Sequence, residues 1–240
     1  MRPVLAVLGV VVFGAIAVAA TAARTPVNTA PQAVARAYAT ADPANTDRVD
    51  LGRQLGRSSP DEGRPRSPAV RGLLIPIEGA PLPTQPELLP NSARDYRAGW
   101  HEGIDFPAAR GTPVHAAAAG TIVRVDRDFV DWDAATLAAA TERAIALGYT
   151  PEETLDRIRG RQVWIDHGRG VVTRYAHLDS VADLHVGDPV ARGQVVGAVG
   201  SSGFEEGGPH LHLEVRVGED YLGDWLEGDA LVSAIRRAFD

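Results

Sequence analysis

Histidine is the residue type in this chain best suited to chemistry, because the sequence contains no cysteine. That absence excludes disulfides, thiolate metal sites and a thiol nucleophile. A metal ion would have to bind through histidine, aspartate or glutamate, which are ligands for zinc and other divalent metals. The seven histidines lie at positions 101, 115, 167, 177, 185, 210 and 212. Two arrangements, a pair of histidines and a histidine with an aspartate, have the spacing of a shared metal site.

The first arrangement is the triplet His210-Leu211-His212. On a strand, residues i and i+2 face the same side, with Cα atoms about 6.6 Å apart. Both imidazoles could bind one ion, or one could bind it while the other faces a metal-bound water. Alone, the triplet is also typical of an ordinary pair on a half-exposed strand.

The second arrangement is His101 followed four residues later by Asp105. In an extended chain these residues would be about 13 Å apart, too far to share a metal. A bend is therefore required, and Gly103 permits one. The segment is not the helical HExxH motif of another zinc protease class, because its fifth residue is aspartate and it lacks a helical apolar period. His177, taken by itself, reads as a histidine at a strand end.

The elements that must position these side chains read as strands. Short runs rich in β-branched residues alternate with glycine, and this pattern is typical of an antiparallel sheet or sandwich. We therefore expect a mainly β domain, with strands in segments 120–125, 162–166, 171–175, 194–199 and 211–217.

Residues 127–160 interrupt this pattern and predict a helical pair inserted between two strands. The alanine-rich stretch from Asp133 to Leu147 predicts one helix, which Gly148 ends. Thr150 is then expected to cap a second helix that runs from Pro151 to about Arg159, with Glu153 completing a capping box. The segment from Asp224 to Phe239 is expected to hold a last helix.

The N-terminal part predicts export from the cytoplasm. Residues 1–23 carry one arginine and a long apolar run, as in a secretory signal or a membrane anchor. Residues 24–70 are rich in Ala, Pro, Ser and charged residues, which predicts a disordered tether. The folded domain is expected to occupy residues 71–240. A net charge of −7 argues against a nucleic-acid partner.

Five motifs, in this order, resemble the lysostaphin-like (LytM-type) zinc endopeptidase family. The resemblance covers about residues 72–225, most of the folded part, and the inserted helical pair is the main departure from the family pattern. The motifs are residues 101–106 (HEGIDF), 111–120 (GTPVHAAAAG), 175–178 (YAHL), 186–194 (VGDPVARGQ) and 200–215 (GSSGFEEGGPHLHLEV).

The resemblance implies a single zinc ion held by His101, Asp105 and His212, with a fourth position left open for water. His177 and His210 would flank that water, one taking its proton and both stabilising the oxyanion. Independently of the resemblance, Glu214 lies two residues beyond His212 on the same face of the expected strand, from which it could orient that ligand. The three other histidines receive no role.

These expectations describe an extracytoplasmic endopeptidase that cuts the peptide cross-links of peptidoglycan with a zinc-bound water as nucleophile. The alternative is a LytM-type regulator that activates other wall hydrolases without catalysing; it is disfavoured because all five site residues are present. A biotinyl or lipoyl carrier is excluded, because the chain has no lysine for attachment.

Overall fold

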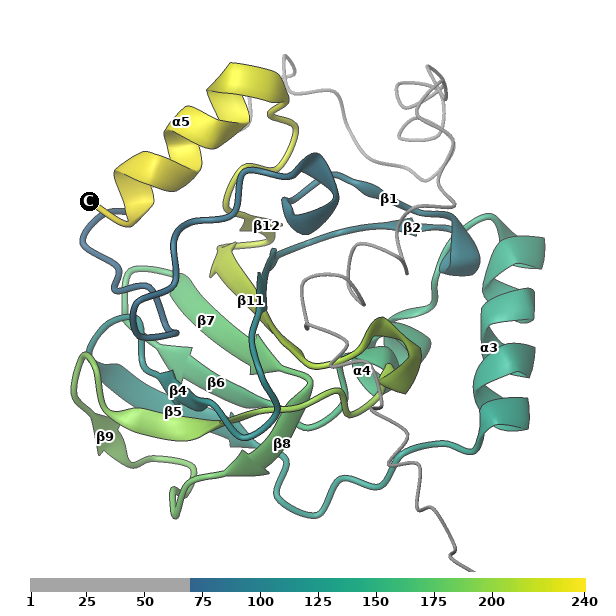
Figure 1. The fold of residues 1–240 in the computed structure, drawn as a ribbon, viewed down its shortest axis with the longest axis horizontal. Coiled ribbons are helices and arrows are strands. Elements are labelled where there is room, and N and C mark those ends of the chain that lie inside the picture. Colours follow the sequence, from purple (N-terminus) through teal and green to yellow (C-terminus); the bar gives the residue numbers. More distant parts are fainter. Residues whose placement is uncertain (1–69) are drawn as a thin grey trace, which may run out of the picture.

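Strand β11 (His210–Val217) is the second strand along the main sheet of the computed structural model and pairs with neighbours on both sides (Figure 1). It pairs antiparallel with β3 (Ile104–Pro107) and with β7 (Val171–Ala176). Side chains alternate across a strand, so Leu211, Leu213 and Val215 face one side and enter the hydrophobic core. The two histidines and Glu214 of the same strand face the other side.

The structure describes residues 70–240, and the expected signal or anchor and all but the last residue of the tether lie outside this range. No helix within the described range is long and apolar enough to cross a membrane.

The main sheet is antiparallel throughout, which confirms the mainly β prediction. Its order is β12-β11-β7-β6-β5-β9, with β3 also on β11. The remaining strands are β5 (Gly120–Val125), β6 (Val163–Asp166), β9 (Pro189–Val190) and β12 (Asp220–Tyr221).

A second antiparallel sheet, in the order β4-β10-β8, contributes to the same core. Val114, Leu178 and Val196 of this sheet are fully buried in one cluster with Ile165 and Tyr175 of the main sheet. The strands are β4 (Pro113–His115), β8 (Leu178–Val181) and β10 (Val195–Val199).

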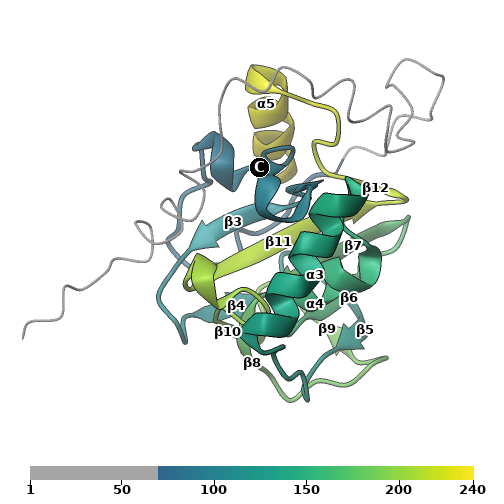
Figure 2. The same ribbon diagram turned by 90° about the vertical axis from the view of Figure 1, so that its right-hand side faces the viewer.

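The inserted helical pair is present and connects the neighbouring strands β5 and β6. Helix α3 (Ala134–Leu147) is capped by Asp133, which accepts a hydrogen bond from the Thr136 amide at 2.9 Å. Gly148 ends the helix with a φ of 75°, a conformation that glycine adopts without strain. Helix α4 (Glu152–Arg159) follows and lies closer to the sheet (Figures 1 and 2).

The expected capping box of α4 was wrong. The cap residue is Pro151, and no side chain caps the helix. The Thr150 hydroxyl instead donates to the carbonyl of Arg97 and accepts from the Arg97 guanidinium at 3.1 Å. The Thr150 side chain, which the local pattern assigned to the helix cap, therefore makes a tertiary contact with Arg97 instead.

A short segment upstream of the site covers one side of the molecule. It comprises β1 (Ala93–Arg94), the 3-10 turn η2 (Asp95–Arg97) and β2 (Gly99–Trp100), and we call residues 93–100 the cover segment. Helix α3 packs against η2 (Figure 1). Two further 3-10 turns and the expected last helix complete the fold, namely η1 (Pro86–Leu88), η3 (Glu205–Gly207) and α5 (Gly228–Ala238).

Candidate metal centre

Three buried side chains bring one donor atom each to a common point. His101 Nε2 lies 3.0 Å from Asp105 Oδ1 and 3.0 Å from His212 Nδ1. His212 Nδ1 lies 2.8 Å from Asp105 Oδ1. Asp105 and His212 face each other across the β3–β11 pair, so strand register, rather than sequence proximity, unites the group.

Gly103 allows His101 to turn back toward Asp105. The chain bends at this residue, between β2 and β3. A Cβ atom here would lie 2.6 Å from the Leu213 carbonyl oxygen and 2.8 Å from His212 Cε1. Any larger residue would therefore displace a neighbour that holds the site.

Both histidines of this trio have their second nitrogen engaged. His101 Nδ1 lies 2.8 Å from the Leu89 carbonyl oxygen, and His212 Nε2 lies 3.3 Å from Glu214 Oε1. If each of these nitrogens donates its proton, the lone pairs of His101 Nε2 and His212 Nδ1 point into the shared group. A tetrahedral zinc with bonds of about 2.1 Å spaces its donors about 3.4 Å apart, so the donor set fits zinc after a small expansion.

His177 and His210 stand beside this trio. Their ring centroids are 4.7 Å apart, and the His177 and His212 centroids are 5.7 Å apart. His177 Nδ1 lies 2.9 Å from the Ser202 carbonyl oxygen, and His210 Nδ1 lies 2.8 Å from that of Gly208. With the Nδ1 protons donated to these carbonyls, each Nε2 carries a lone pair.

At four of these five residues the surroundings lower the pKa, which favours three neutral imidazoles and one ionised aspartate. Burial lowers the pKa of His177 and of His210, and burial together with Arg94 lowers the pKa of His101 to about 3. Burial alone would raise the pKa of Asp105, but the neighbouring histidines hold it well below its usual range.

His212 differs from the other histidines. Burial would lower its pKa, but its hydrogen bonds and charge interactions with Asp105 and Glu214 outweigh that effect and raise the pKa above its ordinary value. The two carboxylates that raise its proton affinity also make its free nitrogen a better electron donor to a metal cation.

The structure thus brings together all five residues singled out in the sequence. It leaves the other histidines apart: His115 and His167 contact the carbonyl oxygens of Pro76 and Ala119, and His185 is exposed.

Sequence reasoning missed two arginines at the centre. Arg94 Nη2, from the cover segment, lies 3.3 Å from Asp105 Oδ2, and the Arg94 side chain is buried. Arg159, the last residue of α4, reaches Glu214. All 24 basic residues are arginine, so nothing in the local sequence distinguished these two from the rest.

The centre is enclosed on the side of the cover segment. The five site residues are each less than 9 % exposed, and the cavity beside them measures about 30 Å³. That volume holds about two water molecules. Tyr96 of the cover segment stacks on Phe204, with ring centroids 5.0 Å apart, and both rings line the cavity.

Comparison with known proteins gives one family match. Residues 99–223, more than half of the chain, match the model of Peptidase family M23. The match includes all five site residues.

Several curated relatives are named for an enzymatic activity, and two examples follow. A DD-carboxypeptidase/endopeptidase, Mpg of Neisseria meningitidis, is 36 % identical over 117 residues, covering 49 % of this chain and 20 % of the relative. The peptidoglycan DD-endopeptidase ShyA of Vibrio cholerae is 30 % identical over 121 residues, covering 50 % of this chain and 21 % of that protein. The chain thus spans about one fifth of the length of these relatives.

A solved structure, a zinc containing peptidase from Vibrio cholerae, superposes with a TM-score of 0.44 at 23 % identity, covering 63 % of this chain and 39 % of that one. The catalytic domain of lysostaphin from Staphylococcus simulans has 28 % identity and a TM-score of 0.34, covering 50 % of this chain and 75 % of that one.

Proposed function

The chain belongs to Peptidase family M23, and from this membership we propose that it is a zinc endopeptidase that hydrolyses peptide cross-links of bacterial peptidoglycan. The names of two relatives support this substrate, since each is called an endopeptidase and one a peptidoglycan endopeptidase. Because peptidoglycan lies outside the cytoplasm, the proposal includes an extracytoplasmic location, with residues 1–23 as the export signal or anchor.

The proposal depends most on the buried trio of His101, Asp105 and His212, whose donor atoms lie 2.8–3.0 Å from one another. These are the residues that would hold the ion. When bound, zinc acts as a Lewis acid on the scissile carbonyl and supplies an acidic water.

His177 and His210 would carry the proton transfers. Each imidazole is neutral because burial lowers its pKa, and each has one nitrogen fixed by a backbone carbonyl. A neutral Nε2 can take the proton of the attacking water and then return it to the leaving amine. As an imidazolium, the same ring donates a hydrogen bond to the developing oxyanion.

A cross-link peptide does not fit into a cavity of about 30 Å³. The proposed activity therefore includes an opening step, in which the cover segment moves away from Phe204. This motion would break the Tyr96–Phe204 stack and the contact of α3 with η2. It would also break the contacts that Arg94 and Arg97 of the cover segment make with Asp105 and Thr150.

The test is to purify the full chain, measure its zinc content and follow release of muropeptides from isolated peptidoglycan by mass spectrometry. We expect about one zinc per chain, and loss of both metal and activity in His101→Ala and Asp105→Ala. The exposed His185 supplies the matched control, and His185→Ala should change neither. A folded, metal-free and inactive wild-type protein would refute the proposal and favour a non-catalytic regulator of other wall hydrolases.

A further inference from the structure

Arg159 joins the inserted helix α4 to the carboxylates around the metal centre. Its Nε donates to Glu214 Oε1 at 2.6 Å, its Nη2 to Glu102 Oε2 at 3.2 Å, and its Nη1 to Glu152 Oε1 at 2.8 Å. The side chain is only 3 % exposed. One planar guanidinium therefore holds three carboxylates in fixed directions.

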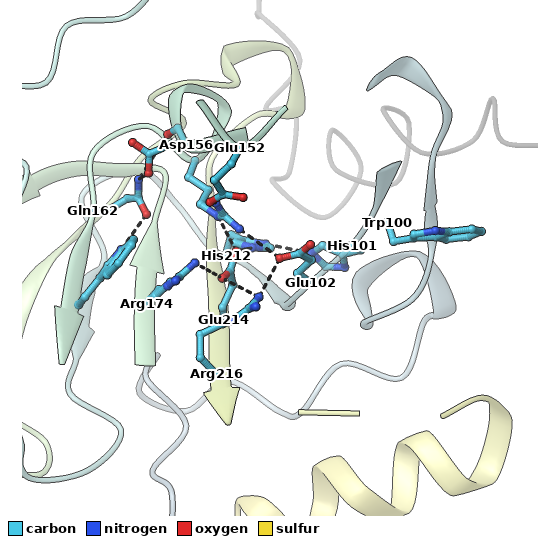
Figure 3. A network of polar contacts seen from close by, with 12 residues as sticks. Trp100, His101, Glu102, Glu152, Asp156, Gln162, Arg174, His212, Glu214 and Arg216 are labelled. Atoms are coloured by element: carbon cyan, nitrogen blue, oxygen red, sulfur yellow. Dashed lines mark hydrogen bonds and ion pairs between the residues drawn. The ribbon is translucent and has the colours of Figure 1, made fainter. Parts of the chain in front are cut away.

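Two of these carboxylates adjoin proposed metal ligands. Glu214 Oε1, which receives the Arg159 Nε proton, is also the atom that lies 3.3 Å from His212 Nε2. Glu102 directly follows His101 in the chain. Figure 3 shows His212, Glu214 and Glu102 converging in one network.

The backbone at Arg159 and Gly160 also contacts His177, one of the two proposed catalytic histidines. The His177 amide donates to the Arg159 carbonyl at 2.8 Å, although His177 has the left-handed φ of 59°. The next residue, Gly160, packs so closely on Ser202 that a Cβ there would lie 2.1 Å from the Ser202 carbonyl oxygen. That oxygen is the acceptor for His177 Nδ1.

We infer that Arg159 is a positioning residue of the metal centre and that the inserted helix α4 serves to place it there. The guanidinium fixes Glu214 against His212, and the backbone carbonyl fixes His177. This inference rests on the proposed zinc site and gives the inserted helical pair a role in it.

Two other arginines would still pair with Glu214 if the Arg159 side chain were changed. Glu214 also receives Arg174 Nη1 at 3.2 Å and has Arg216 Nη1 at 3.6 Å. Loss of Arg159 would thus leave Glu214 partnered, but free to turn about these two longer contacts. The expected defect is a loosened His212 rather than an unpaired buried charge.

The experiment compares the zinc affinity of the full chain, by competition with a chromophoric chelator, among wild type, Arg159→Met, Arg159→Lys and Arg157→Met. Arg157 is the matched control, since it lies on the same helix but stacks on Phe129 and Trp132. We expect Arg159→Met to weaken zinc binding by about 10–100-fold and Arg159→Lys to recover part of it. Arg157→Met should bind as wild type does.

The visible absorption of the Co²⁺-loaded proteins gives a second measure, because it reports the geometry of the ligands. Wild-type affinity and an unchanged cobalt spectrum in Arg159→Met would overturn the inference. If that variant does not fold, Arg159→Lys decides, and wild-type affinity in it would also overturn the inference. Failure of the wild-type chain to bind zinc would instead refute the proposed function.

Discussion

The Tyr96 ring lies nearly parallel to the Phe204 ring, at an angle of 11°, and this contact joins the cover segment to the loop that follows β10. Both residues line the small cavity beside the candidate metal centre. Their stacking makes access to the centre depend on a contact that a single substitution can remove.

We expect Tyr96→Ala to raise kcat/KM on isolated peptidoglycan. An aromatic pair contributes about 0.5–1.5 kcal/mol beyond its buried area, so its loss would raise the open population by up to about tenfold. Tyr149→Ala removes a more exposed ring near the end of α3 and should leave the rate unchanged. A folded, zinc-loaded Tyr96→Ala protein that is slower than wild type would show that the ring binds substrate instead.

Substitution of the two histidines of β11 should have different effects on zinc binding and on turnover. His210→Ala should keep its zinc and lose about 10²–10⁴-fold in turnover, the usual contribution of a general acid–base group. His212→Ala should lose the metal itself, because its Nδ1 belongs to the donor trio. Metal analysis by mass spectrometry beside peptidoglycan turnover checks both. Loss of zinc from His210→Ala would reverse the assignment of roles.

Gly103→Ala should weaken zinc binding, because the new methyl group would collide with the Leu213 carbonyl and the His212 ring. We expect a stability loss of about 1–3 kcal/mol, as for other overpacked sites, together with at least tenfold weaker zinc affinity. Gly218→Ala is a suitable control: its φ of 63° imposes strain, yet nothing lies within 4 Å of the added atom. Denaturant melts and chelator competition should therefore show that Gly218→Ala loses stability only.

The raised pKa of the buried Tyr175 predicts that the protein loses stability at alkaline pH. Burial raises its pKa to about 12, whereas a tyrosine in the unfolded chain ionises near pH 10. The unfolded state therefore releases this proton first, and stability falls by about 1.4 kcal/mol per pH unit between pH 10 and 12. Below pH 10 the contribution is fully present.

The matched variant is Tyr175→Phe, which cannot ionise there. The difference in unfolding free energy between wild type and Tyr175→Phe, from urea melts, should shrink as pH rises from 9 to 12. A constant difference over that range would contradict the raised pKa. All other titrating groups are common to both proteins and cancel in the comparison.

The strands were predictable because their pattern is local. Runs such as Gly120–Val125 carry β-branched residues between glycines, and the structure places strands on all five expected segments. The helices of the insertion were likewise signalled by Asp133, Gly148 and Pro151.

The candidate site could not be predicted from the spacing of its residues along the sequence. Asp105 and His212 are 107 residues apart and meet only through the β3–β11 register, so the ordered motifs, and not local geometry, united them in advance. Arg94 and Arg159 escaped notice because their role comes from tertiary contacts alone. Thr150 shows the converse, since a distant partner, Arg97, overrode its local capping signal.

The position of β11 between β3 and β7 has a consequence for how the protein would acquire the proposed zinc ion. A slip of one residue would turn Leu211 and Leu213 out of the core, so hydrophobic burial fixes the histidines in place. The three donor atoms are therefore in place before any ion binds, unlike those of sites whose folding is driven by the ion. Zinc should leave and return without unfolding the chain, and free zinc concentration then sets the active fraction by simple mass action.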